Sequence, residues 1–484
     1  MFTTGFSFVR VTQQGKVRMK RRSVVVIGGG LAGSLLCNEL VKNADVTLLE
    51  VGHKDRIHYP RVSYDSKKLA DVPTFCFGGG GTTNLWHNGL IPIHQGDVLG
   101  QDFREVLAES DGFMNDAAAR LFFSNGPYSL AYQEAVSELT AVAQTVGLVA
   151  DGVDCLLYPK KYRRLTVDSR VHDFYNVERV GFVFADGRIK AVNYASASRE
   201  YSLDATQVIV AAGAMGSPRI LRDIIQATGH RFETLGTGFI DHPLGFVGKV
   251  RFKKKAASAI RRLSLTDKGD YEIRSGIRLK SACGRYTCCA FFRPALTIHN
   301  NPAVYKYKSR LGASSGLARI RNALSWKLLH PDVIAEVFSR LFGVDIPSRT
   351  YNVLFIAEQK RGGNRVYYDG DNLRVDWSIS AEELAIYRSL LKKLGGILLT
   401  VAEHVNIETD ITEDWLWSGA HHSCTTPLGA TTADLVDKNL KLKFCDNVYV
   451  CDGSVIQEHS YANTGLTIGE LALRLARSVL VSHE

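Results

Sequence analysis

The sequence predicts an α/β protein in which a Rossmann-like nucleotide-binding domain is joined to a substrate domain built on a mostly antiparallel sheet. A glycine-rich turn between two apolar segments near the start of the chain predicts the first domain. A series of strand-like runs in the middle of the chain predicts the second. We expect a basic N-terminal extension at 1–22, a nucleotide-binding domain at 23–243 and 411–484, and a substrate domain at 244–410.

The nucleotide-binding prediction depends on a βαβ pattern at the start of the first domain. A buried apolar strand is expected at 24–27, and a G-x-G-x-x-G pattern follows it. In this pattern Gly28 allows a tight turn, Gly30 lets the backbone approach a pyrophosphate, and Gly33 lets the helix pack closely. Glu50 ends the next apolar run, where a carboxylate can accept hydrogen bonds from ribose hydroxyls. The pattern predicts an adenine dinucleotide site; the alternative is an ordinary βαβ unit with a glycine-rich turn.

A second glycine-rich run lies at 78–81. Four consecutive glycines cannot form a stable helix or strand interior, so the run bends the chain or lets the backbone approach a ligand. Because a dinucleotide site is already predicted, we expect a second contact with the same cofactor here. The candidate lining residues are Thr82, Thr83, Asn84, His87 and Asn88. The alternative is a flexible surface loop, which Trp86 and the flanking apolar runs disfavour.

The rest of the first domain is expected to alternate between helices, strands and turns of small residues. The expected elements are helices around 103–107 and 132–146, strands from 171 to 195 with a turn at 185–187, a buried strand and helix within 207–221, and a turn at 235–243. Within 207–221 the strand leads into Gly213 and Gly216, and the helix is expected to start at Ser217 and Pro218. This strand tip repeats the nucleotide-contact pattern of the first glycine turn.

The middle of the chain combines strand-like runs with basic clusters and apolar stripes. The expected strands of the antiparallel sheet are 245–252, 272–279, 286–292, 352–358 and 373–377. Two apolar stripes follow one another within 317–341, beside basic residues. The ordinary interpretation is packed helices with solvated basic faces. The alternative is a lid or patch at 317–341 that rests on an anionic membrane surface or holds an anionic glycan substrate.

Composition limits the class of protein. With 484 residues, 45% hydrophobic and 22% charged, the chain can form two or three globular domains. No apolar run reaches the roughly 18 residues that a membrane span needs. The net charge of +10 is not accompanied by a nucleic-acid-binding motif, so no nucleic acid partner is expected. Nine scattered cysteines without a C-x-x-C pattern argue for reduced thiols, no metal site and a cytoplasmic location.

The final segment holds the residue types that proton transfer requires. It contains the pair His421-His422, a D-G-S turn at 452–454 and a polar stretch that ends at Thr467. A strand is expected at 447–450 and a closing helix at 468–479. A C-terminal segment that returns to a dinucleotide-binding domain typically completes the ring end of the cofactor site.

These motifs, taken in order, resemble the glucose-methanol-choline (GMC) oxidoreductases, which bind FAD. The motifs that carry the resemblance are GGGLAG with Glu50, GGGGTTNLW, VIVAAGAMGSPRIL, GTGFIDHP, the 364–380 segment, and HHSCTTPLG with NVYVCDGSV and ANTGLTIGELALRLA. The last segment is most similar to the sugar-oxidising and pyranose oxidase-like branch. Two departures stand out: Cys424 replaces the glycine of the family's H-x-x-G-T motif, and Gln457 replaces a proline after the D-G-S turn.

The resemblance implies a set of cofactor and catalytic residues. It implies that FAD contacts Gly28, Gly30, Leu31, Ala32, Gly33, Glu50, Gly80, Gly81, Thr82, Thr83, Asn84, His87, Asn88, Val177, Ala212, Gly213, Asp452, Gly453, Asn463 and Thr464. His421 falls on the family's general base and Asn463 on its partner near the C-terminus. A histidine can accept a hydroxyl proton near neutral pH as hydride leaves the carbinol carbon. His422 and His459 are rival bases.

We expect FAD to be bound without a covalent link. Some family members attach FAD to a histidine directly before a tryptophan, and Leu85 precedes Trp86 here. His87, one position beyond, remains an alternative attachment point.

The resemblance implies oxidation of a CH–OH group to a carbonyl, on a small-molecule or glycan alcohol and most simply on a sugar or glycoconjugate. The electron acceptor stays open. The alternatives are oxidation of a sterol or lipid alcohol, a flavin fold used as an isomerase or lyase, and a binding protein that has lost the base. An intact His421 and Asn463 argue against the last.

Overall fold

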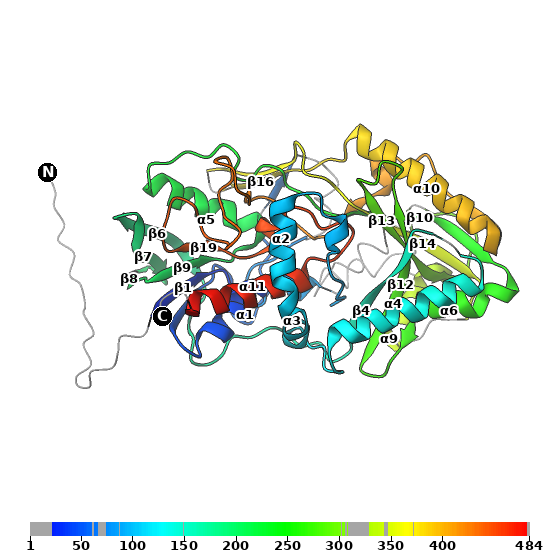
Figure 1. Ribbon diagram of the computed structural model, residues 1–484, viewed down its shortest axis with the longest axis horizontal. Helices are drawn as coiled ribbons and strands as arrows, with labels where there is room; N and C mark the ends of the chain where they lie inside the picture. Colours follow the sequence, from blue (N-terminus) through cyan, green and yellow to red (C-terminus); the bar gives the residue numbers. More distant parts are fainter. Residues whose placement is uncertain are drawn as a thin grey trace.

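A computed structural model of the chain describes residues 22–60, 62–65, 74–86, 88–148, 150–301, 303–304, 307, 329–342, 347–370 and 372–481. Two main sheets organise these residues, one parallel and one antiparallel. Figure 1 shows the parallel sheet toward the left of the molecule and the antiparallel sheet toward the right. The α/β class expected from the sequence is confirmed. Within the described ranges, no helix is long and apolar enough to cross a membrane.

The parallel sheet has five strands in the order β19-β9-β1-β2-β5. These strands are β1 (Ser23–Ile27), β2 (Asp45–Leu49), β5 (His172–Phe174), β9 (Gln207–Val210) and β19 (Val448–Val450). Its helices are α1 (Leu31–Leu40), α5 (Gly213–Ala227) and α11 (Gly465–Val481). Figure 1 shows α11 beside α1, although more than 420 residues separate them in the chain. The C-terminal segment therefore adds both a strand and a helix to the sheet that starts the chain.

The antiparallel sheet follows the order β11-β12-β13-β14-β10-β17, with β4 paired to β12 and β18 paired to β10. Its strands are β4 (Gly152–Pro159), β10 (Pro243–Phe252), β11 (Thr266–Asp267), β12 (Tyr271–Lys280), β13 (Thr287–Ala295), β14 (Thr350–Ala357), β17 (Ala402–Ile407) and β18 (Trp417–Ser418). Four of the five runs expected to form this sheet are confirmed as its strands. Because β4 precedes residue 243, the sheet draws on the first predicted domain as well as on the second.

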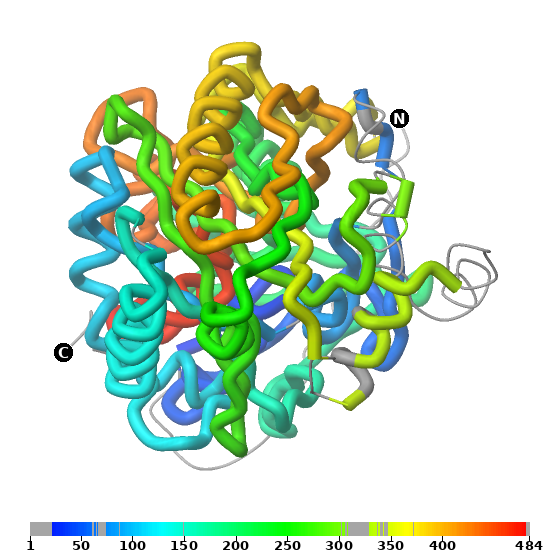
Figure 2. The backbone as a smooth tube through the Cα atoms, turned by 90° about the vertical axis from the view of Figure 1, so that its right-hand side faces the viewer, coloured from blue at the N-terminus to red at the C-terminus, as the bar shows by residue number. Residues whose placement is uncertain are grey.

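Three of the described helices cover one face of the antiparallel sheet. They are α4 (Tyr128–Thr145), α6 (Ala257–Ser264) and α10 (Ala381–Val401), and Figure 2 shows α10 in gold and α4 in cyan on the side facing the viewer. Phe355 packs against Tyr387 of α10 with ring centroids 6.1 Å apart, and Phe292 packs against Phe252 at 5.2 Å. Since successive strand residues point to opposite faces, Phe291 and Leu354 point the other way, toward the parallel sheet.

Two small sheets complete the fold. One is formed by β6 (Val177–Ala185), β7 (Arg188–Ser196) and β8 (Arg199–Asp204); the other by β3 (Val62–Tyr64), β15 (Arg365–Asp369) and β16 (Asn372–Asp376). The turn expected at 185–187 is confirmed: Asp186 and Gly187 have φ of 51° and 71°, as a two-residue hairpin turn requires. The prediction that 373–377 belongs to the antiparallel sheet is wrong, because β16 pairs with β15 and, in parallel, with β3.

The helices expected between residues 100 and 150 are confirmed as α2 (Gln101–Ser110), α3 (Met114–Arg120) and α4. The apolar stripe at 317–328 lies outside the described residues. The second stripe forms α9 (Pro331–Phe342), whose Ile334 and Phe342 are 49% and 64% exposed. Membrane contact through 317–341 stays a prediction.

Helix α5 begins at Gly213, four residues before the start expected from Ser217 and Pro218. Pro218 therefore lies inside the helix, where it has no N–H to donate to the carbonyl of Ala214 four residues earlier. The hydroxyl of Thr425 donates to that carbonyl instead, over 2.8 Å. The predicted start of α5 was wrong because a side chain from the distant C-terminal segment supplies the hydrogen bond that Pro218 cannot make. The same contact ties the segment that carries His421 to a helix of the nucleotide domain.

Replacing Thr425 by valine should lower the free energy of unfolding by about 1–3 kcal/mol, because the buried carbonyl of Ala214 then has no donor. In a Pro218→Ala background the same replacement should cost less, since an alanine at that position restores a backbone N–H in the helix. Denaturant unfolding of the four proteins measures this coupling. Equal losses in both backgrounds would contradict the compensation.

Candidate active site

A cavity of about 770 Å³ lies between the two main sheets. On one side it is lined by the ends of the parallel strands, at Ile27, Leu49 and Ala211, and by the glycine-rich turns. On the other side it is lined by the antiparallel sheet, at β4, β10, β13 and β14. The carboxyl end of a parallel sheet is where α/β folds bind ligands. The volume is within the range of cofactor sites.

The first glycine turn has the geometry that its pattern predicts. Gly28 has a φ of 110°, and a Cβ on it would lie 2.5 Å from the carbonyl oxygen of Ala211. A Cβ on Gly33 would lie 1.8 Å from the carbonyl oxygen of Gly28, so only glycine allows this close packing of helix on strand. Gly30 instead lines the cavity, and a Cβ on it would meet no atom within 4 Å. This open space beside free helix N-terminal N–H groups is where a pyrophosphate fits.

The carboxylate of Glu50 connects three glycine-containing turns. Its Oε2 accepts the N–H of Gly29 at 2.6 Å, and its Oε1 accepts the N–H groups of Gly52 at 2.7 Å and Gly78 at 2.9 Å. Glu50 is 5% exposed and lines the cavity. A carboxylate has about four acceptor positions, so one remains for a ribose hydroxyl. The residue predicted to bind ribose thus also holds the backbone of the site together.

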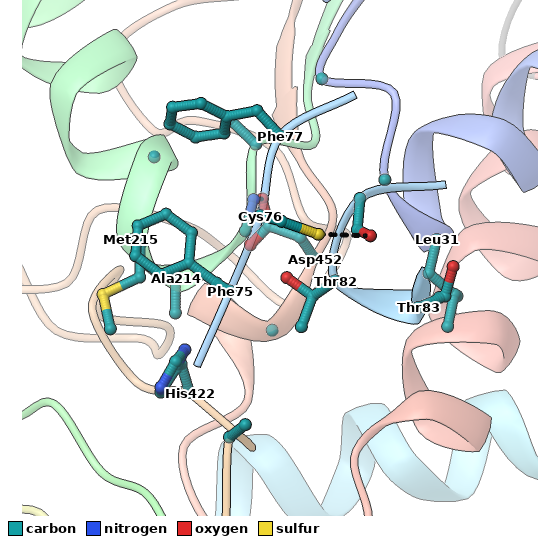
Figure 3. A pocket seen from close by; sticks show the side chains of 18 of the residues that line it. Leu31, Phe75, Cys76, Phe77, Thr82, Thr83, Ala214, Met215, His422 and Asp452 are labelled. Atoms are coloured by element: carbon teal, nitrogen blue, oxygen red, sulfur yellow. Dashed lines mark hydrogen bonds between the residues drawn. The ribbon is translucent and has the colours of Figure 1, made fainter. Parts of the chain in front are cut away.

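The second glycine run packs against the first. The N–H of Gly80 donates to the carbonyl of Gly29 over 2.8 Å, and a Cβ on Gly81 would lie 2.8 Å from Cα of Gly30. Gly81 begins a short 3-10 helix, Gly81–Leu85, whose Thr82 and Thr83 line the cavity. Figure 3 shows these threonines near Leu31 and the hydrogen bond from Cys76 Sγ to the carbonyl of Gly81, over 3.1 Å. The run is a structured part of the cavity wall rather than a surface loop.

Several predicted contacts support the cavity without lining it. Asn84 donates to the carbonyls of Gly79 and Gly81, which fixes the loop. Asn88 is buried and turns toward the carbonyl of Pro159 at 3.5 Å. The predicted residues that do not line the cavity are Gly33, Gly80, Asn84 and Asn88, and His87 lies outside the described residues. The predicted residues that line it, beyond those above, are Ala32, Val177, Ala212, Gly213, Asp452, Gly453, Asn463 and Thr464.

Asp452 joins the C-terminal segment to helix α5 at the cavity. Its Oδ2 accepts the N–H of Gly213 at 2.9 Å and the hydroxyl of Ser217 at 2.5 Å. Burial raises the pKa of this carboxyl above its ordinary value. Asp452 therefore caps the first turn of α5. The D-G-S motif alone did not predict this contact with the helix.

His421 belongs to a cluster of buried imidazoles. Its Nδ1 lies 3.0 Å from Nδ1 of His242, and the ring of His459 packs edge-on against His242 at 4.1 Å. Oδ1 of Asp241 accepts the backbone N–H groups of both His421, at 2.8 Å, and His242, at 2.7 Å. One carboxylate thus fixes the two backbones whose rings meet. His242 comes from the turn predicted at 235–243, but no role had been assigned to it.

The two adjacent histidines both line the cavity, in different surroundings. His422 packs between Phe75 and Phe239, with ring centroids 6.2 and 5.5 Å away, as Figure 3 shows for Phe75. Its Nε2 has no hydrogen-bond partner among the described residues. Burial lowers the pKa of His421 to about 4, against the opposing charge of Asp241, and the pKa of His422 to about 3. Both rings are therefore neutral at neutral pH.

Asn463 lines the cavity, where its side-chain amide donates to the carbonyl of Gly89 at 3.0 Å. That hydrogen bond leaves one amide proton and the amide oxygen for a ligand. His459 does not line the cavity. The structure brings His421 and Asn463 to one cavity from positions 42 residues apart.

The two departures from the family motif contact each other. Cys424 has a φ of 67°, in the left-handed region that favours glycine, so the backbone keeps the conformation of the residue it replaces. Its Sγ lies 3.5 Å from Oε1 of Gln457, the second departure. Nε2 of Gln457 donates to the carbonyls of Thr426 and Val455. The two replacements therefore form one buried polar contact beneath the C-terminal segment.

Sequence reasoning missed the wall that faces the nucleotide side. It consists of Leu156, Tyr158, Leu244, Phe291, Arg293, Leu354 and Ile356. Phe291 and Arg293 lie two residues apart on β13, as do Leu354 and Ile356 on β14, so each pair shares a face. The alternation of residues along each strand could have assigned these residues to a common face. It could not have shown that this face lines the cavity.

The comparisons with known proteins agree with this geometry. A family model described as GMC oxidoreductase, for the C-terminal domain, matches residues 364–472. No protein of curated function matches the chain in sequence. The resemblance to GMC oxidoreductases expected from the motifs is confirmed, and it is carried by residues 364–472, which match the model of the family's C-terminal domain.

Solved structures share the whole fold. Pyridoxine 4-oxidase from Mesorbium loti has a TM-score of 0.61 at 14% identity, and 96% of this chain covers 99% of that one. An FAD-dependent oxidoreductase from Chaetomium thermophilum has a TM-score of 0.57 at 15% identity, covering 95% of this chain and 99% of that one. Formate oxidase has a TM-score of 0.55 at 14% identity, covering 96% and 99%. At these identities the likeness is one of fold.

Replacing Glu50 by glutamine should lower both stability and cofactor content, because an amide N–H₂ would face backbone N–H donors. We expect a loss of about 1–3 kcal/mol in the free energy of unfolding, and less flavin per protein after purification. The control is Glu178→Gln, at a residue that also lines the cavity but has only a 3.4 Å backbone contact. Unchanged stability and flavin content in Glu50→Gln would contradict the bridging role.

The buried histidines should make stability fall in mild acid. Their folded pKa values lie below the ordinary value of 6.5, so the unfolded chain takes up protons first. The stabilisation is complete above pH 6.5 and is lost as the pH falls toward 4. A group such as His422 contributes a loss of about 2 kcal/mol between pH 7 and pH 5. Denaturant unfolding at both pH values should show a smaller loss in His422→Leu; an equal loss would contradict the buried neutral assignment.

Proposed function

We propose that the protein is an FAD-dependent oxidoreductase that oxidises a CH–OH group to a carbonyl, with His421 as general base. The observation that carries the proposal is the position of a half-buried, neutral imidazole in the same cavity as a dinucleotide cradle. FAD binding is supported by the open space at Gly30, the remaining acceptor of Glu50 and the C-terminal family match. We further propose that FAD is bound without a covalent link.

The arrangement around His421 suits proton acceptance. Nδ1 is engaged by His242, so Nε2 is the atom available to a substrate hydroxyl. For Nε2 to accept a proton, Nδ1 must carry one and donate it to Nδ1 of His242, which makes His242 a positioning residue. When bound, FAD supplies a two-electron acceptor for the hydride that leaves the carbinol carbon. Asn463 is placed to hold the substrate oxygen through its remaining amide proton.

The cavity wall favours an apolar alcohol over a sugar. A sugar needs many polar partners to replace the water around its hydroxyls. Five of the seven wall residues on the antiparallel sheet are aliphatic or phenylalanine: Leu156, Leu244, Phe291, Leu354 and Ile356. We therefore place the substrate nearer to the lipid-like alternative than to the sugar-oxidising branch. The electron acceptor is a separate question that the wall does not address.

Anaerobic mixing of the purified holoprotein with candidate alcohols tests the proposal. Bleaching of the flavin absorbance by an alcohol, with the carbonyl formed in equal amount, is the expected result. A yellow protein that no alcohol reduces would favour the isomerase or lyase alternative. A colourless protein would favour a binding module.

Replacing His421 by alanine should slow flavin reduction by about 10²–10⁴-fold while FAD stays bound, because the hydroxyl proton loses its acceptor. The matched control is His422→Ala, which removes the neighbouring imidazole from the same cavity and should retain reduction within a few fold. Stopped-flow absorbance under anaerobic conditions measures both. If His422→Ala is slow and His421→Ala is not, the roles of the two residues are reversed.

A further inference from the structure

Arg293 lies on the substrate side of the cavity, and among the described residues it has no counterion. It follows Phe291 by two residues on β13 and shares its face. The described part of the chain offers its guanidinium no hydrogen bond or ion pair. By contrast, other arginines nearby are paired: Arg278 of β12 with Asp97, and Arg349, directly before β14, with Glu403.

The acidic residues that line the cavity all lie on one side of it, where Arg179 and Arg219 also line it. Its four carboxylates, Glu50, Glu178, Asp223 and Asp452, all lie on the nucleotide side. The described lining residues of the antiparallel sheet include one cation, Arg293, and no acid. Of the lining histidines, His421 and His422 are neutral, because burial lowers their pKa values. The substrate half therefore carries one uncompensated positive charge in partly buried surroundings, where electrostatic attraction is stronger than in water.

The order and register of the strands set the distance between Arg293 and the imidazoles of His242 and His421. His242 directly precedes β10, and β14 separates β10 from β13. Two strand spacings amount to about 10 Å. The register adds an offset along the strands, because Arg293 pairs with Asn352 and Asn352 pairs with Lys249, seven residues after His242. With one bulge in β10, this offset is roughly 20 Å at about 3.3 Å per residue. The sheet surface between these strands is apolar, with Leu244, Ile356, Leu354 and Phe291 along it. A ligand that reaches from His421 to Arg293 crosses this apolar surface.

We propose that the substrate is an apolar alcohol that carries a single carboxylate, and that Arg293 binds this carboxylate. The proposal rests on the function proposed above and names its substrate class. A guanidinium binds a carboxylate through two parallel N–H···O bonds. One positive charge matches one negative charge, which a carboxylate supplies and a phosphate dianion exceeds. The anionic end would lie on the opposite side of the cavity from the predicted pyrophosphate site, which limits repulsion.

The test compares carboxylates with their neutral amides in wild type and variants. The alcohols are 12-hydroxydodecanoate and the longer 16-hydroxyhexadecanoate, each against its primary amide, with flavin reduction followed anaerobically. A second arm measures binding of dodecanoate, hexadecanoate and their amides, which have no hydroxyl to oxidise, by flavin absorbance and calorimetry. The variants are Arg293→Gln, the conservative Arg293→Lys and, as a control, Arg251→Gln. Arg251 lies near the end of β10, does not line the cavity and pairs with Glu403. The control therefore removes the same charge away from the proposed binding site.

We expect wild type to prefer at least one carboxylate over its amide by about 10-fold or more in both arms. Arg293→Gln should bring the ratio near one, Arg293→Lys should keep part of it, and Arg251→Gln should keep it all. A wild type without preference, or an Arg293→Gln variant that weakens acid and amide equally, overturns the proposal. If no alcohol reduces the flavin, the proposed function fails, and the binding arm still decides whether Arg293 is an anion site.

Discussion

The site depends on one buried carboxylate that holds three turns in register. Glu50 accepts backbone N–H groups from Gly29, Gly52 and Gly78, which belong to turns that the chain visits separately. Each of these turns is rich in glycine and has little side-chain packing of its own. Buried N–H groups without an acceptor are costly, so the carboxylate fixes the backbone as well as offering a ribose contact. The cavity exists because this hub brings the two glycine runs into contact.

A second set of contacts joins the C-terminal segment to helix α5 of the nucleotide domain and to the segment before β10. Thr425 completes the helix that Pro218 would otherwise interrupt, and Asp452 caps the start of the same helix. Asp241 then fixes the backbones of His421 and His242. The base is thus held by hydrogen bonds from elements on both sides of the cavity. The cofactor cradle and the imidazole of His421 are therefore fixed by two sets of hydrogen bonds around one cavity.

The sequence predicted the parts of this arrangement that follow from local patterns. Apolar periodicity located the strands and helices of both sheets, and glycine spacing located both cofactor turns. The start of α5 was wrong because Thr425, about 210 residues away, supplies the bond that Pro218 lacks. The prediction of the sheet to which β16 belongs was wrong, because its parallel partner β3 lies about 310 residues earlier in the chain. Arg293 and His242 had no local signal, since their roles arise from what faces them across the cavity.

A structure of the purified holoprotein tests the central claim most directly. The account predicts a non-covalent FAD whose pyrophosphate lies at Gly30 and whose isoalloxazine lies on the nucleotide side of the cavity beside His421, which leaves the face of β13 that carries Phe291 to the substrate. Nε2 of His421 should point to the space above the ring where a carbinol would sit. A ring at the Val177 end of the cavity, or an imidazole of His421 turned away from it, would contradict the account even if the glycine turns hold the phosphates.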